Sequence, residues 1–291
     1  MRVRLLSSFF LFWLWASAAS AAAPQLVLDV ARFRTLAAGN TYEVELYATV
    51  PGNGLTYVKR AQGSYQAAAV VTLHILKADG KPAYSEAITL KPPVISDTSI
   101  AIKNPQSFLK RITLPAGQYT LRGELRDMYR KSAAPAKVEQ SLALDFPAAA
   151  PALSDVVFLA KAASTTTEQS NFIRGGHLLS RTPGGAYARA SDQLFFYLEM
   201  YQVPAGQPLK LHYHIESEDG AAADADAAIA QAKSGRPTPV VGELPLGPLP
   251  PDNYTLTVEV RNAAGKVLAT RKAKLSRGTQ DYAPEAASLP R

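Results

Sequence analysis

The sequence contains no cysteine. This absence excludes disulfide bonds, thiol catalysis and a lipid anchor on a cysteine at a cleavage site. The two tryptophans, Trp13 and Trp15, both lie at the extreme N-terminus, and no later apolar run approaches the roughly 20 residues that span a bilayer. The folded part therefore depends on ordinary core burial, for which domains of roughly 120 residues are large enough.

The N-terminus has the pattern of an export signal. Arg2 and Arg4 precede the apolar run Leu5–Trp15, and small residues follow, ending in Ala19–Ala21. The alternative, a membrane anchor, needs a run about twice as long. We expect residues 1–21 to be a cleaved signal peptide and the protein to be exported to the periplasm, or alternatively secreted or held at the cell surface.

The chain carries 31 basic and 24 acidic residues, a net charge of +7 that is spread along its length. The densest basic stretches, Arg126–Lys131 and Arg271–Lys274, are short. A mild, dispersed excess is typical of a solvated surface rather than of nucleic-acid binding. We therefore expect no nucleic-acid partner and no transmembrane segment after signal removal.

Short alternating segments separated by turns dominate the rest of the chain. Segment 42–48 alternates apolar and polar residues, the period of a half-buried strand, and Asp79-Gly80 is typical of a hairpin turn. The segment Leu114–Asp127 recurs in similar form as Leu249–Asn262. The pattern predicts an all-β protein of two tandem immunoglobulin/fibronectin-III-like β-sandwich domains.

The repeat also sets the expected boundaries. They are domain 1 over 26–146, a linker over 147–152, domain 2 over 153–275 and a disordered tail over 276–291. In each copy a tyrosine, Tyr119 or Tyr254, stands at the entry to a late strand. We interpret both as tyrosine corners, in which the hydroxyl bonds back to nearby backbone.

Two insertions interrupt the regular succession of short strands and turns in the second copy. Residues 163–186 are rich in Ser, Thr and Gly, and residues 221–233 are rich in Ala. Because Ala favours helix strongly, we expect a short helix in the second insertion.

An aromatic stripe distinguishes the two copies. If Phe196, Leu198 and Met200 face the core of domain 2, then Phe195, Tyr197 and Tyr201 face outward. The equivalent positions in domain 1 include Thr41, Glu43 and Tyr47. An apolar stripe must be covered or used. Cover could come from insertion 163–186 or from the other domain, and the alternative is a surface for a partner protein or a glycan.

His212 and His214 lie two apart on a predicted strand and share one face with Glu216. A zinc site is one interpretation, and a solvated strand face is the one we favour. Nearby acids could suggest calcium, but their spacing matches no EF-hand loop, so a solvated loop is again favoured. These acids are Glu216, Glu218, Asp219, Asp224 and Asp226. We expect no metal and no cofactor.

No catalytic motif is present. Arg174–His177 and Pro183–Gly185 are Gly-rich, but neither is followed by the Lys-Ser/Thr of a phosphate loop. The sequence also lacks Gly-x-Ser-x-Gly, the motif that presents the nucleophilic serine of many hydrolases. We expect the protein not to be an enzyme.

Several short segments form a recognisable set. They are Leu153–Leu159, Phe172–Gly176 and Leu194–Tyr201 in domain 2, with Asp29–Phe33, Glu45–Tyr47 and Val50-Pro51 in domain 1. Together these segments resemble the N-terminal region of bacterial GWxTD-domain-containing proteins. The Gly-Trp-x-Thr-Asp segment itself is absent. The resemblance implies an exported β protein and transfers no functional residue.

Together these observations predict an exported, non-catalytic binding or scaffolding protein of the bacterial cell envelope that acts through protein–protein contacts. The alternative is a carbohydrate-binding or adhesive surface protein. The candidate binding surface in either case is Phe195, Tyr197, Tyr201, His212 and His214.

Overall fold

A computed structural model describes residues 24–279, with short gaps at 36–39, 62, 100–104, 148–149, 168, 204–205, 207, 219, 221, 230–231 and 233–234. The proposed signal peptide and most of the proposed tail lie outside the described residues.

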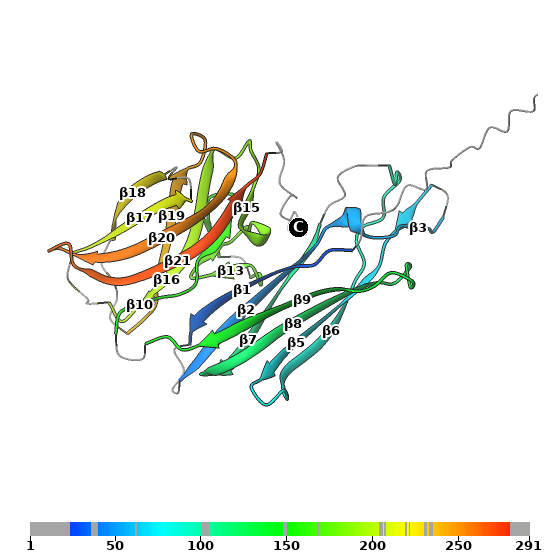
Figure 1. The fold of residues 1–291 in the computed structure, drawn as a ribbon, viewed down its shortest axis with the longest axis horizontal. Helices are drawn as coiled ribbons and strands as arrows, with labels where there is room; N and C mark the ends of the chain where they lie inside the picture. Colours follow the sequence, from blue (N-terminus) through cyan, green and yellow to red (C-terminus); the bar gives the residue numbers. More distant parts are fainter. Residues whose placement is uncertain are drawn as a thin grey trace, which may run out of the picture.

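The first sandwich packs a three-stranded sheet against a four-stranded sheet (Figure 1). The first sheet has the order β1-β2-β7 and the second β6-β5-β8-β9, with antiparallel pairing throughout. A two-stranded hairpin, β3-β4, extends from one end. The strands are β1 (Val27–Arg34), β2 (Thr41–Val50), β3 (Val58–Lys59), β4 (Tyr65–Gln66), β5 (Ala69–Lys77), β6 (Pro82–Leu90), β7 (Gln106–Pro115), β8 (Gly117–Asp127) and β9 (Ala136–Leu144), with a 3-10 turn at Gly52–Gly54.

The second sandwich repeats this plan. The strand β16 corresponds to β2 of the first sandwich. Two short strands, β10 and β11, pair with one edge of β16 as β1 pairs with β2, and β19 pairs with the other edge as β7 does. The other sheet has the order β15-β21-β20-β17-β18. The strands are β10 (Ala152–Leu153), β11 (Val157–Leu159), β15 (Ala186–Tyr187), β16 (Gln193–Tyr201), β17 (Leu209–Ser217), β18 (Ala222–Ile229), β19 (Thr238–Pro245), β20 (Asp252–Asn262) and β21 (Val267–Arg277).

The insertion between β11 and β16 forms a small sheet of its own, with the order β12-β14-β13. Its strands are β12 (Ser164–Thr165), β13 (Ile173–Arg174) and β14 (His177–Leu178), and a 3-10 turn, η2 (Pro183–Gly185), follows. In the first sandwich the corresponding connection, from Arg34 to Thr41, is much shorter. The extra chain therefore belongs to the second sandwich alone.

The alternating patterns place the cores as expected. Val71, Leu73 and Ile75 of β5 are buried in the first sandwich, and Leu211 and Ile215 of β17 are buried in the second. Their neighbours in sequence face outward, as the strand period of two requires. The prediction of an all-β, immunoglobulin/fibronectin-III-like fold is confirmed.

Both tyrosines at the strand entries bond back to the backbone. The Tyr119 hydroxyl donates to the Pro115 carbonyl at 3.1 Å, and the Tyr254 hydroxyl donates to the Pro250 carbonyl at 2.6 Å. Both rings are buried in their cores. This is the geometry of a tyrosine corner, made once in each sandwich.

Two expectations about the second sandwich are wrong. The Ala-rich insertion forms strand β18 and not a helix, because its Ala and Asp residues alternate: Ala223 and Ala225 pack on the core while Asp224 and Asp226 are exposed. The pairing with β17 outweighs the helix propensity of Ala. The predicted tail begins too early, since β21 continues to Arg277, whose buried guanidinium donates to the carbonyls of Leu246 and Leu249.

Candidate functional site

The most unusual feature of the described structure is a buried cluster of charged side chains between the two sandwiches. It contains three carboxylates and three guanidinium groups. They are Glu43 and Glu45 of β2, Glu199 of β16, Arg111 of β7, Arg174 of β13 and Arg181 of the insertion. We call this set the charged joint.

Arg174 is the centre of the charged joint. Its Nε donates to Glu199 Oε1 at 2.7 Å and its Nη1 to Glu45 Oε1 at 3.0 Å, and it also contacts Glu43. Its guanidinium carbon lies 3.4 Å from the centre of the Phe33 ring. One side chain of the insertion therefore binds carboxylates from both sandwiches and stacks on an aromatic ring of the first.

Glu45 is fully buried and is held by three cations. Besides Arg174, Arg181 of the insertion contacts it, and Arg111 Nε donates to its Oε1 at 2.7 Å. Burial raises the pKa of Glu45, but attraction to Arg181, Arg174 and Arg111 outweighs burial and leaves the pKa below the usual value. The carboxylate is therefore ionised at neutral pH despite its burial.

Glu199 accepts hydrogen bonds from two tyrosines of its own strand. The Tyr197 hydroxyl donates to its Oε1 at 3.1 Å and the Tyr201 hydroxyl to its Oε2 at 2.8 Å. Burial, reinforced by the Glu199 charge, raises the pKa of both phenols well above the usual value. Both tyrosines therefore stay protonated and act as hydrogen-bond donors. The Tyr201 hydroxyl also accepts the backbone N–H of Arg34 at 3.1 Å.

A second ion pair crosses the boundary nearer the linker. Arg32 of β1 binds both oxygens of Asp155, with Nε to Oδ2 at 2.6 Å and Nη2 to Oδ1 at 2.8 Å. Arg32 and Arg271 both place their guanidinium groups over the Phe146 ring, at 5.5 and 4.9 Å from its centre. The backbone N–H of Gly184 adds a contact to Asp29 at 2.9 Å.

Apolar side chains surround these charges. A separate buried cluster joins Ala31 and Phe33 of the first sandwich to residues of the second. Its members from the second sandwich are Val157, Leu159, Leu179 and Tyr197. The boundary therefore combines an apolar contact with paired charges, and the charges are costly unless every partner is in place.

The aromatic stripe lies inside this boundary. Tyr197 is fully buried, Tyr201 is 5 % exposed and Phe195 is half-buried. The prediction of these three residues as a free binding surface is wrong, because the insertion and the first sandwich cover them. Cover from those two sources was the other expectation, and it is confirmed.

Sequence reasoning missed Arg174 and Arg181 as ligands of the charged joint. In the sequence Arg174 belongs only to a Gly-rich segment and to the resemblance segment Phe172–Gly176, and neither assigns it a role. A usable signal is that Glu45 and Glu199 occupy equivalent positions of the repeat, each on the outer face of a strand and two residues before a tyrosine.

The two histidines lie on the outer face of β17, away from the charged joint. Their ring centres are 5.8 Å apart, and His212 Nδ1 is 2.8 Å from Asp226 Oδ1. Within the described part of the chain, no group of three or more His, Asp or Glu residues is arranged to hold a metal ion. Asp219 lies outside the described residues.

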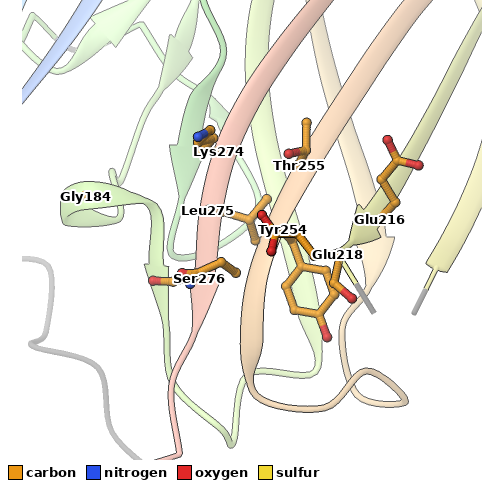
Figure 2. A pocket seen from close by; sticks show the side chains of 10 residues that line it. Gly184, Glu216, Glu218, Tyr254, Thr255, Lys274, Leu275 and Ser276 are labelled. Carbon is orange, nitrogen blue, oxygen red and sulfur yellow. The ribbon is translucent and has the colours of Figure 1, made fainter. Parts of the chain in front are cut away.

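An open groove of about 570 Å³ lies where the ends of β17, β20 and β21 meet the η2 turn (Figure 2). Glu216, Thr255 and Lys274 sit side by side on the three strands, and Gly184 borders the other side. Adjacent strands are roughly 5 Å apart, so Glu216 and Lys274 are two strands, or roughly 10 Å, from each other and do not form a direct acid–base pair. The groove is lined by hydrogen-bonding groups from three strands.

Comparison with known proteins supplies no family. No protein-family model and no curated protein matches the chain. Among the described residues, no helix has the length and apolar character needed to cross a membrane.

Solved structures give only distant likenesses. A red sea bream transglutaminase is 11 % identical, with a TM-score of 0.27 over 87 % of this chain and 31 % of its own. A Bacteroides uniformis β-glucuronidase is 12 % identical, with a TM-score of 0.30 over 82 % of this chain and 26 % of its own. A tetra-tandem repeat from the extending region of a large adhesion protein is 9 % identical, with a TM-score of 0.24 over 88 % of this chain and 68 % of its own. The chain thus spans less than a third of each of the two enzymes, and no activity follows.

The charged joint should make stability depend on pH. Glu45 holds its proton more weakly in the folded protein than in the unfolded chain, so its contribution is present above its ordinary pKa of 4.5 and is lost as pH falls below that value. Asp29, whose pKa is raised mainly by burial, acts in the opposite direction. We expect urea unfolding curves at about pH 7 and about pH 3.5 to differ less in Glu45→Gln than in the unaltered protein. An equal difference in both proteins would contradict this role for Glu45.

Proposed function

We propose that this protein is an exported, non-catalytic binding or scaffolding protein of the bacterial cell envelope that presents two β-sandwiches in one fixed orientation to a protein partner. The charged joint is the observation that carries the proposal. Domains within one chain ordinarily move relative to each other unless their interface is large and apolar.

The chemistry of the charged joint explains why it would fix an orientation. Arg174 must meet Glu43, Glu45 and Glu199 together, and any other arrangement of the sandwiches would leave at least one buried charge unpaired. Leaving a buried ion unpaired costs several kcal/mol, so buried charges discriminate strongly between alternative arrangements. A fixed orientation is useful to a scaffold that holds two surfaces at a set spacing.

Other features support the location and the absence of catalysis. The N-terminal pattern and the resemblance to GWxTD-domain proteins favour export to the envelope. The buried carboxylates of the charged joint, Glu45 and Glu199, are each bound by arginine and are therefore committed to structural ion pairs. The glycan alternative loses its proposed platform, because Tyr197 and Tyr201 are buried.

Site-specific photo-crosslinking in the native envelope tests the proposal. A crosslinking amino acid would replace Arg122 on the outer face of the first sandwich or Lys272 on that of the second, both exposed, and buried Tyr201 would be the control position. We expect a discrete protein adduct from an exposed position and a weaker adduct when Arg174→Met loosens the charged joint. No adduct from either exposed face, or an adduct indifferent to Arg174→Met, would contradict a scaffold of fixed geometry.

A further inference from the structure

One end of the first sandwich gathers basic and exposed apolar side chains. Three loop regions meet there, at residues 51–66, 91–99 and 126–131, and we call them the basic tip. The Tyr65 and Ile95 backbones exchange hydrogen bonds at 2.8 and 2.9 Å, and the Asp127 carboxylate accepts the Thr56 N–H at 2.7 Å. Figure 1 shows β3 at this end, opposite the linker between β9 and β10.

Basic residues outnumber acidic ones in the basic tip. Its loops hold six basic and two acidic residues, and one of the six, Arg126, is paired with Glu124 just outside the loops, with Nε to Oε1 at 2.6 Å. The basic residues are Lys59, Arg60, Lys91, Arg126, Arg130 and Lys131. Of the two acids, Asp127 is buried and accepts backbone N–H groups from Thr56 and Tyr129. The Arg60 guanidinium stacks 5.2 Å from the centre of the Tyr129 ring, a neutral partner that leaves its positive charge uncompensated.

Apolar side chains project from the same loops. Among the described residues, four large apolar side chains are well exposed, and two of them belong to the basic tip. These are Val94, 52 % exposed, and Met128, 42 % exposed. Exposed apolar residues flanked by Lys and Arg are the combination that membrane-surface segments use, with the apolar groups at the acyl boundary and the cations among the headgroups.

The N-terminal apolar run precedes the same end of the first sandwich. Val27 at the start of β1 pairs with Thr49 at the end of β2, so the chain enters the sandwich at the end that carries the basic tip. The apolar run Leu5–Trp15 precedes that entry by only 11 residues, from Ala16 to Leu26.

We propose that the basic tip binds the surface of an anionic lipid bilayer. The proposal goes beyond the scaffold function and does not depend on the charged joint, since no residue of the tip takes part in it. Each Lys or Arg close to an anionic surface strengthens binding about fivefold, and salt weakens the attraction. A bilayer fits better than an acidic protein because the exposed side chains of Val94 and Met128 belong to the same loops as the cations, and because the apolar run Leu5–Trp15 precedes this end of the sandwich by only 11 residues.

Vesicle co-sedimentation tests the proposal with the chain from residue 22 onward, which contains every described residue and lacks the apolar N-terminal run. We expect binding to phosphatidylcholine vesicles that contain about 30 % phosphatidylglycerol, weakening with salt, and little binding to phosphatidylcholine alone. The variant Lys59→Glu/Arg60→Glu/Lys131→Glu loses three of these contributions and should bind at least about 100-fold more weakly. Val94→Ser/Met128→Ser should weaken binding and leave its salt dependence unchanged.

A matched variant separates the basic tip from general charge. Lys210→Glu/Lys272→Glu/Lys274→Glu makes the same change in charge on exposed residues of the second sandwich and should bind like the unaltered protein. Unchanged melting temperatures would show that both variants fold.

Equal binding to the two kinds of vesicle, or equal losses in the two triple variants, would overturn the proposal. So would binding to polyglutamate without binding to vesicles, which would assign the tip to an acidic protein. Arg174→Met should keep its vesicle binding even if the scaffold proposal fails.

Discussion

Arg174→Met is expected to lower the free energy of unfolding by about 3–5 kcal/mol. The substitution keeps an unbranched apolar side chain next to Phe33 but removes the cation that Glu43, Glu45 and Glu199 share. Glu199, which is buried, would then lose its ion-pair partner, while Glu45 would keep only Arg111 and Arg181. Urea unfolding at neutral pH would measure the loss.

The control for this prediction is an arginine in an exposed ion pair. Arg122 Nε binds Glu139 Oε2 at 2.6 Å, a distance much like that from Arg174 to Glu199, but both side chains are more than half exposed. Arg122→Met should therefore cost at most about 1 kcal/mol. Equal losses in the two variants would mean that burial of the charged joint contributes nothing, and the account of the boundary would be wrong.

Gly242→Ala is expected to destabilise the second sandwich by about 3 kcal/mol, at the upper end of the usual cost of overpacking. Gly242 of β19 lies opposite Phe196 of β16. A methyl group added there would lie 2.1 Å from Cζ and 2.4 Å from Cε1 of the Phe196 ring. The ring is fully buried in the core and has no free space into which it could move.

Gly247→Ala is the matched control for this prediction. Its added methyl group would meet Asp192 Oδ1 at 3.6 Å, an ordinary contact distance. We expect thermal unfolding of Gly247→Ala to remain close to that of the unaltered protein, while Gly242→Ala melts several degrees lower. Similar melting temperatures for the two variants would show that the core around Phe196 adapts easily.

The sequence predicts the sandwiches well because their signals are local. Alternation in a strand such as 69–77 and the repeated tyrosines need only a few neighbouring residues to be recognised. At 222–229 two local signals conflict, since composition favours a helix and alternation favours a strand. Pairing with β17 decides the outcome, and the composition of a single segment contains no information about that pairing.

The charged joint was beyond this kind of prediction because its parts are far apart in the chain. Arg174 is 131 residues from Glu43 and 129 from Glu45. The strand that carries Arg174 is only two residues long and has no periodicity to recognise. The repeat does align Glu45 with Glu199, but the cation that binds both is in an insertion that the first sandwich lacks.

The central claim is that the charged joint holds the two sandwiches in one orientation. Because the chain has no native cysteine, spin labels can be placed on Thr89→Cys and Thr270→Cys alone, two exposed positions on different sandwiches. Pulsed electron resonance would then measure the distribution of distances between the labels. We predict one narrow distribution that broadens in Arg174→Met, whereas a distribution equally broad with and without Arg174 would contradict the claim.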